Sequence, residues 1–175
     1  MEPTASNLAA AVTQAAAREL DSALAKIEHC LGQLNDEQLW WRPAGAMNSI
    51  GNLLLHLSGN LRQWIIAGLG GAEDVRNRSA EFAEQGLIER EQLLQQLRST
   101  VAQTKDALAN LTAADLLRSR RIQGFDVNGL EAIFDSIPHF RGHTQEIVHL
   151  TRVQLGNAYQ FDFVPSSPEQ GAPAT

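Results

Sequence analysis

The sequence has one cysteine, few basic residues and no long apolar run, and each shortage excludes a class of protein. The single cysteine, Cys30, cannot form an internal disulfide, and it excludes a cysteine-rich zinc site. Lys and Arg number 14 against 20 Asp and Glu, and this net charge of -6 leaves no electrostatic footprint for nucleic acid or for an anionic membrane surface. No uninterrupted apolar run approaches the roughly 18 residues of a membrane-spanning helix.

Two further features bear on location and domain organisation. The N-terminus, Met1-Glu2-Pro3-Thr4, lacks the basic start of a secretory signal, so we expect a soluble cytoplasmic protein. Hydrophobic residues make up 43% of the 175 residues, enough for one buried core, and we expect one domain over residues 1–160. Residues 161–175 mix proline with Ser, Gly and Ala, which predicts a short disordered tail.

Four stretches of the chain carry apolar residues at spacings of three and four, which is typical of amphipathic helices. They cover residues 6–34, 50–67, 87–111 and 128–155. Alternating apolar and polar residues, the pattern of a half-buried strand, are almost absent. The sequence therefore predicts an all-α fold, a four-helix bundle.

The connecting stretches carry weaker signals. Residues 72–86 have mixed charge and no strong period, which predicts a loop between the second and third helices. Residues 117–128 include the basic run Arg118-Ser119-Arg120-Arg121. We interpret this run as a solvated loop, because isolated charge runs are more often solvated than anion-binding.

Three of the five histidines face the bundle interior when residues are placed at about 100° per position on a helical wheel. His56 borders the apolar arc of the second helix. His139 and His143 stack one turn apart beside the apolar face of the fourth helix. Buried imidazoles need polar partners, and one divalent cation would satisfy all three rings.

Such a cluster is typical of a catalytic metal site. Two histidines four residues apart can hold one ion from a single helix, and a third from a facing helix leaves a coordination position open for water or substrate. Imidazole ligands suit Zn, Ni, Cu and Fe. The alternative is three hydrogen-bonded core or rim histidines, because the i, i+4 spacing alone is a weak signal. Phe140 follows His139, so the His-Glu-x-x-His motif of metalloproteases is absent.

Glu146 and Asn60 are the candidate catalytic residues beside this cluster. Glu146, within one turn of His143, is a fourth ligand, an acceptor that orients an imidazole, a base toward metal-bound water, or a rim carboxylate that never meets the metal. Asn60, one turn from His56, either orients metal-bound water or forms a buried hydrogen bond between helices. Pro138 removes one backbone hydrogen bond and predicts a bend in the fourth helix.

The other residues of chemical interest have simpler interpretations. His29 and His149 lie off the apolar stripes and are expected at the surface or at an interface. Cys30 has no adjacent base or cation to activate its thiol, so we interpret it as a buried apolar residue. The three tryptophans are expected to pack the core, with one of them available to wall a pocket.

Two stretches of the chain resemble helices of the DinB-like superfamily. Residues 48–64, Asn-Ser-Ile-Gly-Asn-Leu-Leu-Leu-His-Leu-Ser-Gly-Asn-Leu-Arg-Gln-Trp, look like its second helix, and residues 139–147, His-Phe-Arg-Gly-His-Thr-Gln-Glu-Ile, resemble its fourth-helix signature. Trp41-Arg42-Pro43 fits the segment ahead of the second helix. The similarity runs in order from about Leu8 to Gly156, and it is greatest to a branch known only as a domain of unknown function.

This resemblance implies a four-helix bundle of the DinB type, commonly a homodimer, with one divalent metal, Zn or Ni, bound by three histidines. Carried over position by position, the ligands are His56, His139 and His143, the same three that the helical wheels bring together. The superfamily usually has Gly-Gln where this chain has Gln145-Glu146, so the resemblance assigns Glu146 no role.

The leading functional hypothesis is a metal-dependent enzyme that acts on a small molecule. Related branches include thiol-dependent S-transferases and a thiol-dependent isomerase, which implies thiol transfer by analogy, and hydrolysis by metal-bound hydroxide is the other reaction that an open site permits. The alternative is a non-catalytic metal-binding protein or dimeric interaction module of the stress response. A cavity at the open face of the metal would distinguish them, because an enzyme must admit a ligand.

Overall fold

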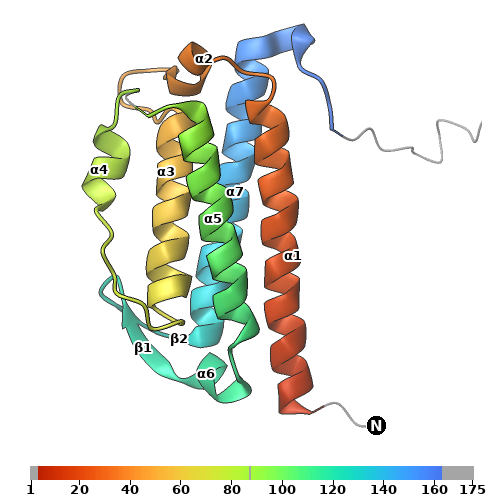
Figure 1. Cartoon of the computed structure of the whole chain (residues 1–175), viewed down its shortest axis with the longest axis vertical. Helices are drawn as coiled ribbons and strands as arrows, with labels where there is room; N and C mark the ends of the chain where they lie inside the picture. The colour runs from red at the N-terminus through yellow and green to blue at the C-terminus, as the bar shows by residue number, and fades with distance from the viewer. Residues whose placement is uncertain (1–3, 87, 163–175) are drawn as a thin grey trace, which may run out of the picture.

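Four long helices form the body of the molecule. The computed structural model describes residues 4–86 and 88–162. Helices α1 (Ala5–Leu31) and α3 (Ile50–Leu61) each pack against both α5 (Arg90–Ala109) and α7 (Gly129–Leu155), as Figure 1 shows. The predicted all-α four-helix bundle is confirmed.

The direction of the chain sets the connections. In Figure 1 the chain ascends in α1 and α7 and descends in α3 and α5. The segment that follows α3 therefore has to climb the side of the bundle before α5 can begin. We call this segment, residues 68–86, the crossover.

The helices begin where the sequence offers capping side chains. Thr4, Ser49 and Asn128 precede α1, α3 and α7, and each side chain accepts a hydrogen bond from a backbone N–H in the first turn. Each cap stabilises its helix by about 1 kcal/mol. The predicted helices end within three residues of the observed ones over the described chain, except that the last six residues of the second, 62–67, form a π-helical turn instead of α-helix.

The core lies along the axis of the bundle. It is built mainly from leucine and isoleucine of all four helices, and small residues of α1 such as Ala9, Ala16 and Ala23 allow close helix packing. Helix α7 continues through Pro138 without ending, and the bend expected there stays a prediction. Phe140, two residues further on, is almost completely buried.

Helix α3 continues into one π-helical turn, η1 (Arg62–Ala67), in which the N–H of Gly68 donates to the carbonyl of Gln63 at 3.0 Å. A Cβ on Gly68 would lie 2.6 Å from the side chain of Ile122, so the glycine lets another segment approach closely. Turns of this kind are frequent at functional sites.

That approaching segment is a β-hairpin, so the prediction of a loop over residues 117–128 is wrong. Strands β1 (Ser119–Ile122) and β2 (Phe125–Asn128) pair antiparallel at the lower end of the bundle (Figure 1). Gln123 and Gly124 have φ values of 52° and 87°, the positive values that a two-residue hairpin turn requires. Four-residue strands are too short to give a recognisable alternation.

The prediction of a loop over residues 72–86 is wrong in part, because the short helix α4 (Arg78–Ala83) forms inside the crossover. The side chain of Asn77 accepts a hydrogen bond from the N–H of Ala80 and caps the helix. A helix of one and a half turns is too short to show a hydrophobic period in the sequence.

Smaller elements complete the described chain. Helices α2 (Asp36–Trp40) and α6 (Ala113–Leu117) begin after the capping residues Asn35 and Thr112, and the 3₁₀ turn η2 (Gly156–Ala158) follows α7. Within the described residues, no helix combines the length and apolar character that crossing a bilayer requires. Most of the tail predicted for residues 161–175 lies outside the described residues.

Candidate metal centre

Three imidazole rings converge between α3 and α7. The ring centroids of His139 and His143 are 4.5 Å apart, and the centroid of His56 lies 5.0 Å from the first and 5.2 Å from the second. One ring nitrogen of each residue lies within 4.8 Å of the others. The helical wheels predicted this convergence correctly.

The three rings fit a single cation. The Nε2 atoms of His56 and His139 are 2.9 Å apart. Two nitrogens bound to one tetrahedral zinc at about 2.0–2.1 Å would be about 3.3 Å apart. A cation therefore requires His56 and His139 to separate by a few tenths of an ångström, and the nitrogen of His143, within 4.8 Å of theirs, to move toward it. Without a cation, a single Nε2 proton has to be shared between the His56 and His139 rings.

A buried ion pair from the crossover contacts the His56 ring. Glu81 of α4 lies 3.0 Å from Nδ1 of His56 and also accepts two hydrogen bonds from Arg76, at 2.7 and 2.8 Å. Both side chains of this pair are at least nine-tenths buried. Burial raises the pKa of Glu81, but the hydrogen bonds from Arg76 and His56 outweigh it, so the net pKa lies below its ordinary value.

This pair selects the tautomer of His56. Arg76 Nη2 also lies 3.1 Å from His56 Nδ1, but a guanidinium can only donate, whereas the carboxylate can only accept. A neutral His56 ring with its proton on Nδ1 therefore pairs with Glu81 and leaves the Nε2 lone pair facing the other histidines. Carboxylates orient metal-binding histidines in this way in many proteins.

Glu146 makes the equivalent contact with the His143 ring. Its Oε2 atom lies 2.7 Å from Nδ1 of His143, one turn back along α7. Among the four roles considered for Glu146, this contact favours an acceptor that orients the imidazole. The pair is more exposed than the Glu81 pair, with 24% of the His143 side chain and 39% of the Glu146 side chain accessible.

The His139 ring is kept neutral by its surroundings. Burial, followed by the nearby His143 and His56, lowers the pKa of His139 from 6.5 to about 4. A neutral ring keeps a lone pair at neutral pH, and only the neutral form can bind a metal ion.

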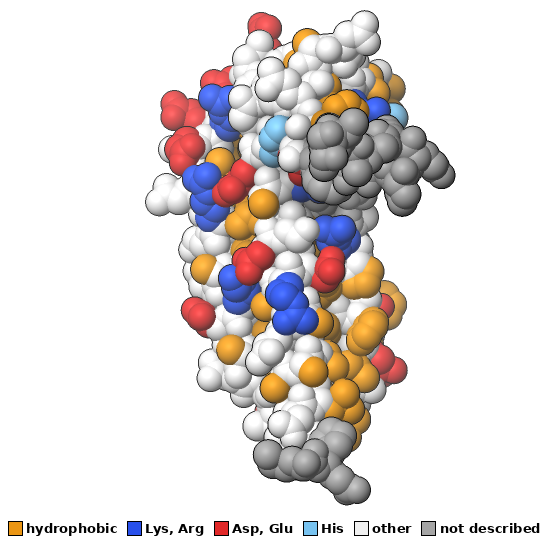
Figure 2. Space-filling view, turned by 90° about the vertical axis from the view of Figure 1, so that its right-hand side faces the viewer, with side chains coloured by type: hydrophobic (Ala, Val, Ile, Leu, Met, Phe, Trp, Pro, Cys, Tyr) orange, Lys and Arg blue, Asp and Glu red, His pale blue; other side chains and the backbone are white. Residues whose placement is uncertain are grey.

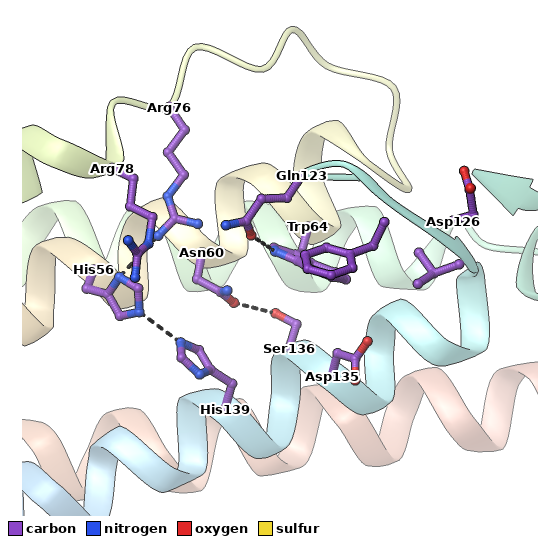
Figure 3. Close-up of a pocket in the computed structure, with 12 residues that line it drawn as sticks. His56, Asn60, Trp64, Arg76, Arg78, Gln123, Asp126, Asp135, Ser136 and His139 are labelled. Carbon is purple, nitrogen blue, oxygen red and sulfur yellow. Dashed lines mark hydrogen bonds between the residues drawn. The ribbon is translucent and has the colours of Figure 1, made fainter. Parts of the chain in front are cut away.

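Asn60 forms a buried hydrogen bond between helices, one of the two roles considered for it. Its Oδ1 accepts from the Ser136 hydroxyl of α7 at 2.8 Å. Figure 3 shows this bond one turn beyond the His56–His139 contact. Asn60 is also part of the wall of the cavity described next.

An open cavity of about 440 Å³ lies beside the histidines (Figure 3). His56 and His139 line one end, and the hairpin closes the other with Phe125. Trp64 faces Phe125 with ring centroids 6.3 Å apart and donates its indole N–H to Gln123 at 2.9 Å. The expectation that one tryptophan walls a pocket therefore holds for Trp64.

The crossover is fastened to the bundle by two residues that precede or begin α3. Arg42 donates to the carbonyl oxygens of Phe82 and Glu84 and to the side chain of Asn52. Asn52 in turn donates to the carbonyls of Glu81 and Glu84 at 3.0 Å. These bonds hold α4 against α3, and with it the carboxylate that meets His56.

The fit between α4 and α3 depends on one glycine. A Cβ built on Gly59 would lie 2.0 Å from Oε1 of Glu81 and 2.9 Å from Nε of Arg76. Only a residue without a side chain leaves room for this ion pair beside the helix.

The remaining candidates lie away from the cluster. His29 contacts the carbonyl oxygen of Gln160 at 2.7 Å, and His149 is exposed on α7. Cys30 is completely buried, and burial raises the pKa of its thiol, as an inert core residue requires. The arginines of the basic run pair with acidic neighbours such as Asp115 and are not part of the site.

The crossover side chains of the site were not predicted from the sequence. Arg76, Arg78 and Glu81 sit in a charged segment without periodicity, and nothing in their spacing points toward His56. The available signal was indirect. Gly59 interrupts the middle of an apolar helix, and such a glycine often marks a close approach by another segment.

The geometry is that of a four-helix bundle with a three-histidine cluster, and solved structures of DinB-like proteins share this fold. Solved structures with the same fold include a conserved protein from Enterococcus faecalis, with a TM-score of 0.71 and 22% identity, covering 82% of this chain and 97% of that one. DinB-like proteins from Bacillus cereus and Bacillus subtilis match with TM-scores of 0.62 and 0.63 at 18% and 16% identity. They cover 82% and 85% of this chain, and 90% and 96% of their own lengths.

The chain belongs to the family described as protein of unknown function DUF1572, which it matches over residues 7–167. The resemblance to a DinB-like branch of unknown function is thereby confirmed. No curated protein matches the sequence.

Proposed function

We propose that this protein is a divalent-metal-dependent enzyme that acts on a small molecule, with His56, His139 and His143 as the ligands. The observation that carries the proposal is the convergence of three ring nitrogens within 4.8 Å beside an open cavity. Three nitrogen ligands leave a coordination position free, and the cavity gives a small molecule access to it.

The ligand set suits zinc or nickel, which are the metals that we propose. A metal held in this way supplies a Lewis acid that lowers the pKa of bound water or stabilises a thiolate. Two reactions follow from that chemistry: transfer of a thiol to a small molecule, and hydrolysis. The reducing cytoplasm, where we propose the protein works, suits a thiol substrate.

The chain's own side chains have separate roles in this proposal. Glu81 and Glu146 accept hydrogen bonds from the Nδ1–H groups of His56 and His143 and so direct the opposite nitrogens toward the ion. Asn60 keeps its amide nitrogen available to the cavity, because only its oxygen is used by Ser136. That nitrogen can donate a hydrogen bond to a substrate or to water on the metal.

Metal analysis of protein purified without a histidine tag tests the proposal. We expect about one zinc or nickel ion per chain, and His139→Ala should abolish binding while the helical circular dichroism spectrum persists. His149→Ala is the matched control, since it removes an exposed histidine from the same helix. Full occupancy in a His56→Ala, His143→Ala double variant would refute the site.

A second observation favours an association between two copies, as in the dimeric interaction module that is one form of the non-catalytic alternative. Alanines and aliphatic residues of α1 and α7, including Ala11, Ala15 and Ile133, form an almost wholly apolar groove beside Phe134, which is 65% exposed. Figure 2 shows orange side chains gathered along this face. In a two-fold dimer, the Phe134 of each copy can fill the groove of the other, so we infer a homodimer through this face.

Sedimentation analysis tests the dimer separately from the metal site. Phe134→Glu should give a monomer that still binds metal. Leu117→Glu, at a residue 75% exposed on α6, should leave the dimer intact. A wild-type protein that sediments as a monomer at micromolar concentration would contradict this inference.

A further inference from the structure

One arginine of the cavity has no carboxylate partner in the part of the chain that the structure describes. The guanidinium of Arg76 already donates hydrogen bonds to Glu81 and to Gln63. Arg78 lines the same cavity and, among the residues that the structure describes, has no carboxylate partner. Its guanidinium is therefore available to an external anion.

Arg78 is held in position by aromatic rings. Its guanidinium carbon lies 4.9 Å from the centroid of the Phe82 ring, a cation–π contact. The Phe82 ring in turn stacks on the His56 ring with centroids 4.9 Å apart. Arg78 and His56 line the same cavity, and Figure 3 draws both at the same end of it. An anion on this guanidinium would thus lie next to the proposed metal.

The other end of the cavity has a different chemistry. Trp64 and Phe125 provide aromatic surface there, and the carboxylates of Asp126 and Asp135 line the same cavity. Asp126 is paired with Arg121, whereas Asp135 has no basic partner among the described residues. This end would repel a second negative charge and accept an apolar or planar group.

We propose that the substrate is a small organic molecule with one carboxylate and an apolar or aromatic body. The carboxylate binds Arg78 beside the metal, and the body extends toward Trp64 and Phe125. This assignment rests on the proposed metal-dependent function. A guanidinium matches a carboxylate because it can donate two parallel hydrogen bonds. A phosphate dianion fits less well, because the described residues that line the cavity offer one guanidinium without a carboxylate partner and the two carboxylates of Asp126 and Asp135.

Titration of cobalt-loaded protein with benzoate tests the proposal, with the visible absorption of the cobalt as the readout. Benzoate should perturb the spectrum saturably, and neutral benzamide should not. Arg78→Gln should weaken benzoate binding at least about tenfold, as expected for the loss of a charge-assisted hydrogen bond. The control is Arg118→Gln, an exposed arginine outside the cavity, which should bind benzoate like the wild type. Terephthalate, with a second carboxylate, should bind more weakly than benzoate.

The outcomes separate the two proposals. Failure to bind cobalt would refute the metal site and this assignment together. Cobalt binding without a response to benzoate, equal binding of benzamide, or unchanged affinity in Arg78→Gln would refute the substrate assignment and leave the metal site intact. Terephthalate binding as tight as benzoate would overturn the single-carboxylate assignment.

Discussion

The three histidines of the site belong to α3 and α7, two helices of the bundle that pack into the core. Arg76 and Glu81 belong to the crossover, where the one helix, α4, has six residues. The histidines are positioned by the packing of leucine, isoleucine and phenylalanine over several turns. The ion pair is positioned by a few hydrogen bonds from Arg42 and Asn52 and by the absence of a side chain at Gly59.

Because the two parts of the site are held by different interactions, substitutions in them should have different consequences. Damage to the bundle should remove the fold and the site together. Damage to the crossover should leave the fold in place and loosen the site.

The largest effect is expected in the bundle. Phe140→Ala removes a side chain that is 1% exposed next to His139, and it should lower the free energy of unfolding by about 3–5 kcal/mol because of the cavity left behind. Urea unfolding measures this change. Val153→Ala, on the same helix but 53% exposed, is the control and should cost much less.

The next effect is expected where the crossover meets α3. Gly59→Ala places a methyl group 2.0 Å from Oε1 of Glu81, so the ion pair must leave His56. Metal affinity should fall about 10–100-fold, as for other losses of a group that orients a ligand, with the helical content unchanged. Gly142→Ala on α7 is the matched control, because its Cβ meets nothing within 4 Å. Equal metal affinity in both variants would show that the crossover does not support the site.

A smaller effect is expected at Glu146. Glu146→Gln keeps an oxygen acceptor for His143, and the pair is partly exposed, so metal affinity should fall less than tenfold. Glu81→Gln removes the charge beside the buried Arg76 and should have the larger effect. Isothermal titration of both variants with zinc makes the comparison. The reverse order would mean that Glu146 contacts the metal or its water.

An effect that is absent at neutral pH and develops only in acid is expected from the titration of His139 in metal-free protein. Its pKa is about 4 when folded and 6.5 ordinarily, so the unfolded chain binds the proton more tightly. Stability should therefore be unaffected by this ring above about pH 6.5, should decline as the pH falls toward 4, and should change no further below that. Urea midpoints measured over this range check the sign. The loss of stability between pH 6.5 and 4 should be smaller in His139→Ala. An identical loss in that variant would show that other groups cause it.

Much of the fold could be predicted because the helices are long. Over three or more turns, the three- and four-residue spacing of apolar residues fixes which face is buried, and caps such as Ser49 and Asn128 fix where each helix begins. The same wheels placed the three histidines on inward faces. The hairpin at residues 119–128 and helix α4 were missed because each is too short to carry a period of its own.

The four-helix bundle and the convergence of His56, His139 and His143 follow from the sequence alone, because burial of apolar stripes leaves amphipathic helices few ways to pack. Only the tertiary structure decided which groups surround that cluster. Glu81 and Arg78 reach it from a segment with no periodic pattern, and the hairpin brings Phe125 to the far end of the cavity. Their positions depend on long-range contacts, such as those of Arg42 and Gly59, that local spacing does not encode.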